Sequence, residues 1–89
     1  MFRLWGKIWK DNHLLSDHVY EESSDDTRTH KVFRGIDALA LNFNLGRPIW
    51  LDKNIAEFKR HHKTRFGKDC FIEEIEFDCL EIEIIEDDY

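Results

Sequence analysis

The sequence predicts an α+β domain in which a small antiparallel sheet carries helices on one face. Apolar and polar residues alternate with a period of two near both ends of the chain, as they do in half-buried strands. Between these ends, apolar residues recur at the three- and four-residue spacing of amphipathic helices. The chain has 89 residues, 42% of them hydrophobic, which is enough for one modest core. We therefore treat residues 1–89 as a single domain.

The first element is an N-terminal β-hairpin. Residues 2–10 alternate strictly, and turn-forming residues then separate them from a second strand at residues 14–21. One face of the first strand is apolar and turned toward the core. The other face carries two indoles and two cations: Arg3, Trp5, Lys7 and Trp9.

A first helix is expected over residues 29–43. A short polar side chain within residues 24–26 can cap it, because its oxygen accepts from the free N–H groups of the first turn. Gly46 is expected to end the helix in the left-handed conformation. Gly35 costs about 1 kcal/mol relative to Ala in mid-helix, so we expect another element to approach closely there.

A second helix is expected from Asp52, as its cap, to the residue before Gly67. On its helical wheel His62 falls in the core stripe, whereas His61 points to solvent. The basic residues near its end would offset the negative end of the helix dipole.

The last third of the chain predicts a short third helix and a C-terminal strand. Residues 70–76 fit one or two helical turns, and residues 80–85 alternate again. On the strand, Glu81 and Glu83 match the cations of the first strand, and opposite charges across two strands are favourable. We therefore expect the last strand to pair with the first, giving strand order 2-1-3 with all helices on one face.

Charge is distributed unevenly within a formal net charge of −6. Residues 47–68 hold seven Lys and Arg against two acids, whereas residues 69–89 hold ten acids and no Lys or Arg. Such a division indicates either a basic binding surface or two segments that lie together and neutralise each other.

The sequence also bears on location. It contains no apolar run long enough for a membrane span and no signal-peptide pattern. Its two cysteines, Cys70 and Cys79, are expected to be reduced thiols. We expect a cytoplasmic protein that does not associate with membranes.

No motif predicts catalysis or a bound cofactor. Adjacent residues on a helix point about 100° apart, so His61 and His62 cannot share one metal ion. The chain also lacks a zinc-ligand spacing, a glycine-rich phosphate loop and a nucleophile motif. We therefore expect a protein without catalytic residues, metal or cofactor.

Two surfaces are candidates for binding. The first is the mixed aromatic and basic strand face together with an exposed leucine, and it predicts a protein partner or self-association. Its residues are Arg3, Trp5, Lys7, Trp9 and Leu41. The alternative is nucleic-acid or polyanion binding, through that same strand face or through the basic end of the second helix. The residues of this helix end are Lys59, Arg60, Lys63, Arg65 and Lys68.

The segment GRPIWLDKNIAEFKRHHKTRF, residues 46–66, preceded by SDDTRTHKVF, resembles a group of small uncharacterised bacterial proteins of similar length. The stretch RPIWL is the most distinctive part of the likeness. The resemblance implies a free-standing bacterial cytoplasmic domain, and it carries no activity, ligand or partner across.

Overall fold

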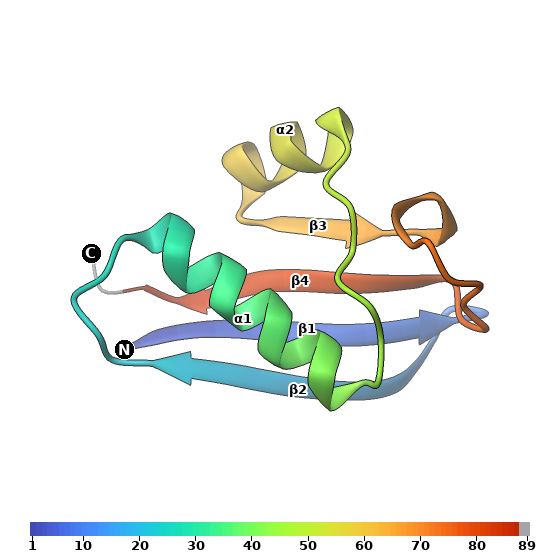
Figure 1. The fold of residues 1–89 in the computed structure, drawn as a ribbon, viewed down its shortest axis with the longest axis horizontal. Coiled ribbons are helices and arrows are strands. Elements are labelled where there is room, and N and C mark those ends of the chain that lie inside the picture. The colour runs from blue at the N-terminus through green and yellow to red at the C-terminus, as the bar shows by residue number, and fades with distance from the viewer. Residues whose placement is uncertain (88–89) are drawn as a thin grey trace.

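The computed structural model describes residues 1–87, and it consists of a four-stranded antiparallel sheet with two helices (Figure 1). Its elements in chain order are β1 (Phe2–Lys10), β2 (His13–Glu22), α1 (Arg28–Asn42), α2 (Asp52–His61), β3 (Lys63–Phe66), the 3-10 turn η1 (Lys68–Cys70) and β4 (Cys79–Glu86). The strand order is β2-β1-β4-β3. Figure 1 shows α1 crossing obliquely over the sheet, with α2 beside β3 at the far edge. The predicted α+β class is confirmed.

The predicted three strands and the order 2-1-3 are wrong, because β3 adds a fourth strand outside β4. The expected pairing of the C-terminal strand with the first strand is present in the sheet. We assigned residues 63–66 to the second helix because Phe58, His62 and Phe66 share a helical stripe. The same residues also alternate, and Thr64 and Phe66 are the buried positions of β3. Pairing with β4 therefore decided between two periodicities that the sequence allows.

The second helix is shorter than predicted, since it ends at His61. The following residue, His62, takes the left-handed conformation with φ 56°, and its N–H donates to the Phe58 carbonyl at 2.9 Å. His62 is exposed, so its expected place in the core is wrong. His61 is exposed, as predicted.

The first helix begins and ends slightly apart from the predicted positions. Thr27 is its N-cap, with its Oγ1 accepting from the His30 N–H at 3.3 Å, so the cap lies just after residues 24–26. Asn44, with φ 58°, takes the left-handed conformation that we expected at Gly46. An Asn tolerates this conformation because its short polar side chain can bond locally.

Two further expectations are wrong. Asp52 lies in the first turn of α2 and Leu51 occupies the cap position. The predicted third helix is absent: residues 71–78 are irregular, and the only helical turn near them is the three-residue η1 at residues 68–70. The apolar residues that suggested a helix lie in an irregular segment, and two of them, Phe71 and Ile75, are buried in the core.

The helix α1 packs closely on β1 through reciprocal glycines. A Cβ on Gly35 would lie 2.8 Å from Leu4 Cδ2, and a Cβ on Gly6 would lie 2.9 Å from Leu39 Cδ1. Each glycine therefore makes room for a leucine of the other element. This contact is the close approach expected at Gly35. The core around it is formed by Phe2, Leu4, Ile8, Val32, Ile36, Leu39, Phe66, Cys70, Phe71, Ile75, Leu80 and Ile82.

Candidate binding surfaces

The first candidate surface is the sheet face turned away from the core, which we call the outer face. It carries the predicted strand residues, and β3 adds two cations that the sequence placed on a helix. Lys63 and Arg65 reach this face because they lie opposite Glu83 and Glu81 on β4. The charged and indole side chains of the outer face are Arg3, Trp5, Lys7, Trp9, Asp17, Glu21, Lys63, Arg65, Glu81, Glu83 and Glu86.

A buried ionic pair lies at the centre of the outer face. Glu81 is 3% exposed and Lys7 is 8% exposed, although neither helix of residues 1–87 covers this side of the sheet. Trp9 Nε1–H donates to Glu81 Oε1 at 2.7 Å, and Lys7 Nζ lies 3.9 Å from the centroid of the Trp5 ring. Lys7 Nζ also donates to Glu83 Oε1 at 3.1 Å. Two indoles thus take the place of a covering layer, and partners satisfy the charges beneath them.

The N–H group of the second indole, Trp5, also has a hydrogen-bond acceptor. Trp5 Nε1–H donates to Asp17 Oδ2 at 2.8 Å. The Arg65 guanidinium lies 5.8 Å from the Trp9 ring centroid, with its Nε 3.8 Å from Glu81 Oε2. The surface that the two half-buried indoles still present to solvent is therefore mainly ring carbon.

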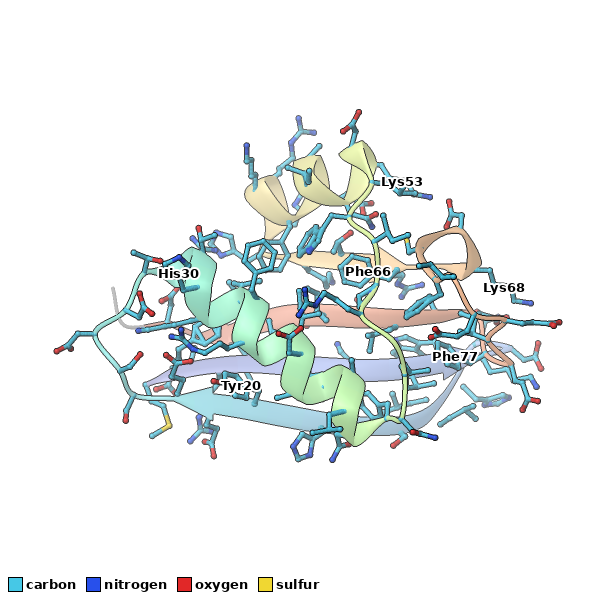
Figure 2. The ribbon with its side chains drawn as sticks, in the orientation of Figure 1. Tyr20, His30, Lys53, Phe66, Lys68 and Phe77 are labelled. Carbon is cyan, nitrogen blue, oxygen red and sulfur yellow. The ribbon has the colours of Figure 1, made fainter. Side chains whose placement is uncertain are left out.

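The predicted basic cluster does not form one surface. Lys59 and Arg60 lie on α2, whereas Lys63 and Arg65 lie in β3 on the outer face. Lys68 lies in η1, on the far side of α2 from the α1 N-terminus (Figure 2). The basic and acidic segments of the chain lie together, as one of our two alternatives proposed. Examples are the Arg65–Glu81 pair at 3.8 Å and the Lys53–Asp69 pair at 3.5 Å.

Leu41 is 83% exposed on α1. It lies on the helical side of the sheet, so it does not join the tryptophans of the outer face. The structure therefore separates the residues of the predicted interaction surface onto two sides of the molecule.

Sequence reasoning missed a second surface, a cavity of about 490 Å³ between α1 and α2 that we call the α1–α2 groove. Trp50 is central to its aromatic lining, with ring centroids 5.5 Å from Phe58 and 6.5 Å from Phe33. On the side of the sheet, the Trp50 ring centroid lies 5.0 Å from that of Phe66 in β3. Figure 2 shows side chains gathered there between the helices. The groove is lined by Arg28, Thr29, Val32, Phe33, Trp50, Ile55, Phe58 and Lys59. Its only signal in the sequence is Trp50 within RPIWL, the stretch between the two expected helices.

Residues 1–87 contain no group of three or more His, Cys, Asp or Glu side chains placed to hold a metal ion. Both cysteines are free thiols in buried positions, and burial raises the pKa of Cys70 and of Cys79. No helix in the described part of the chain is long and apolar enough to cross a membrane. Comparison with protein-family models, curated proteins and solved structures found no match.

Proposed function

We propose that this chain is a non-catalytic interaction domain that binds a second copy of itself through the outer face. The observation that carries the proposal is a sheet face without helical cover on which Trp5 and Trp9 remain half-exposed. Their N–H groups are already bonded within the chain, so a partner would meet apolar ring surface without leaving a donor unpaired. Trp and Arg are also enriched in protein interfaces.

The mixed charge of the outer face supports a second copy as the partner. A two-fold interface brings the same patch of both molecules together, so it needs both signs of charge on one surface. On this face the cations of β1 and β3 alternate with the carboxylates of β2 and β4. A rotated copy can therefore place cations opposite carboxylates.

The same charges argue against the alternative of nucleic-acid binding. A polyanion gains affinity from cations that lack partners, and the cations of the outer face are already paired. Carboxylates also slightly outnumber cations there, so phosphates would meet repulsion. Nucleic-acid binding remains the second outcome of the test below.

The test is the molar mass in solution, measured by light scattering at about 0.1 M and about 1 M salt. We expect a dimer at both salt concentrations, with no change when a short mixed-sequence single-stranded oligonucleotide is added. Leu14 is 45% exposed and lies opposite Trp9, so Leu14→Glu should give a monomer. Leu41→Glu, a matched change on the helical side, should leave the dimer intact.

Two results would overturn self-association. One is a monomer at every protein concentration and both salts. The other is a monomer that gains mass only with the oligonucleotide at low salt, which would support nucleic-acid binding by the outer face instead.

We also propose a cytoplasmic location. Two free, buried thiols support it, because exported proteins of this size tend to use their cysteines in disulfides. Fractionation of cells that express a tagged chain tests the location, and recovery outside the cytoplasm would refute it.

A further inference from the structure

We propose that the α1–α2 groove binds a small elongated apolar molecule with one anionic group, of the chemical class of medium-chain carboxylates. The groove lies on the helical side of the sheet, so this site is separate from the outer face. The two proposals can therefore fail independently.

The size and lining of the groove support a small-molecule ligand. Its volume of about 490 Å³ falls within the range of small-molecule sites, and five of its lining side chains are apolar or aromatic. Phe33 and Ile55 at its walls are 48% and 41% exposed, which leaves large apolar surface in water. A ligand that covers them gains hydrophobic free energy in proportion to the area removed from water.

The length of the groove disfavours a helix of a protein partner. Its lining covers six positions of α1, from Arg28 to Phe33, and five of α2, from Ile55 to Lys59. These stretches are about 9 Å and 8 Å long, whereas a partner helix is about 10–12 Å wide and anchors over several turns. A single alkyl chain fits this space better.

The charges at the groove select an anion. Arg28 and Lys59 line it, and no carboxylate within residues 1–87 does. The Arg28 Nε lies 3.3 Å from Asp87 Oδ2, whereas Lys59 has no carboxylate partner among the described residues. Arg28 is also the first residue of α1, at the positive end of the helix dipole. Because Arg28 is already paired with Asp87, Lys59 is the cation that a ligand carboxylate would pair with, and no carboxylate of the described lining competes for it.

Trp50 differs from the other two tryptophans in the hydrogen bonding of its indole N–H group. Trp5 and Trp9 donate their indole N–H groups to carboxylates. The Trp50 N–H has no acceptor among the described residues, although the residue lines the groove. It therefore adds one donor that a ligand oxygen can satisfy.

The test uses three probes with the same alkyl chain: decanoate, 1-decanol and decyltrimethylammonium. Each is titrated into ¹⁵N-labelled protein while the three indole N–H signals are followed by NMR. We expect decanoate to shift the Trp50 signal at lower concentration than decanol, and the cationic probe to bind least. The Trp5 and Trp9 signals report on the opposite face and should stay in place.

Two variants separate the anion site from general apolar binding. Lys59→Gln should weaken decanoate binding roughly 5-fold, as expected for loss of one exposed charge pair, and leave decanol binding unchanged. Lys68→Gln removes a charge that is also exposed but lies away from the groove, and it should have no effect.

The proposal is overturned if decanoate at millimolar concentration leaves the Trp50 signal unmoved. Equal affinity for the three probes, equal effects of the two lysine variants, or shifts confined to Trp5 and Trp9 would each overturn it as well. None of these outcomes changes the molar mass expected for self-association through the outer face.

Discussion

Asn54 illustrates how much of this fold depends on one residue. Its side chain is fully buried, and its Nδ2 donates to Thr64 Oγ1 and to the Arg65 carbonyl, both at 2.9 Å. Its Oδ1 accepts from the Leu51 N–H at 3.1 Å and from the Cys70 thiol at 3.5 Å. One amide therefore joins the start of α2 to β3 and to η1.

We expect Asn54→Ala to lower the free energy of unfolding by about 2–3 kcal/mol, because it leaves buried donors and acceptors without partners. Urea denaturation followed by circular dichroism measures the change. Asn42→Ala, at an exposed position in the last turn of α1, should change the free energy by less than about 0.5 kcal/mol. Equal losses in the two variants would contradict the role assigned to Asn54.

Residue-level prediction was accurate for local chemistry and poor for distant partners. The hairpin turn was predicted correctly, and Asp11 and Asn12 take the two positive φ angles that a type I′ turn requires. The role of Asn54 could not be predicted, because three of its four partners lie 10 to 16 positions further along the chain. The same limit misplaced His62, since its helical periodicity says nothing about where the helix stops.

At the scale of elements, the contact between α1 and β1 depends on two glycine–leucine pairs. A Cβ on Gly6 would meet three atoms of the Leu39 side chain, the farthest at 3.3 Å, and Leu39 is fully buried. Leu39 is part of the packed core, so it can move only if its neighbours move with it. The helix must therefore shift, or the core must repack, when this glycine is replaced.

Gly6→Ala should cost about 1–3 kcal/mol through overpacking, and Leu39→Ala about 2–5 kcal/mol through the cavity it leaves. The double variant should lose less than the two losses combined, since the new methyl group occupies space that the leucine vacates. A double-mutant cycle in urea measures this coupling. Simple additivity would show that the two residues do not share the space described.

Element types were predictable where one periodicity dominated, as in the hairpin, α1 and β4. Residues 63–66 satisfied both periodicities, and the sequence offered no reason to end α2 before them. The strand formed because β4 had an open edge, which is a property of the assembled sheet. The α1–α2 groove was unpredictable for a similar reason, since it requires the relative placement of two helices.

At the scale of the whole molecule, stability in acid depends on carboxylates held by cations. Arg34 of α1 donates from its Nε to Glu22 Oε1 at the end of β2, at 3.0 Å. This hydrogen bond, with help from Ser24 and Tyr20, lowers the pKa of Glu22 to about 2. Because the folded pKa lies below the unfolded one, the contribution of Glu22 is complete above about pH 4.5 and disappears as the pH falls toward 2.

Glu22→Gln should therefore destabilise the protein near neutral pH and flatten the decline of stability between about pH 4.5 and 2. Urea midpoints measured across this range provide the test. Glu74→Gln, at an exposed position in the irregular segment, should leave the curve of the unchanged protein in place. A Glu22→Gln curve parallel to that of the unchanged protein would contradict the linkage.

The two thiols lie in different layers of the molecule. Cys70 belongs to the core near α2, and Cys79 lies opposite Trp9 on the outer face. Both are buried with raised pKa values, so an alkylating reagent can reach either only when its own layer opens. The alkylation rate of each thiol therefore reports how often its own side of the sheet opens. Identical alkylation rates would mean that the two sides open as one unit, whereas different rates would show which side opens more often.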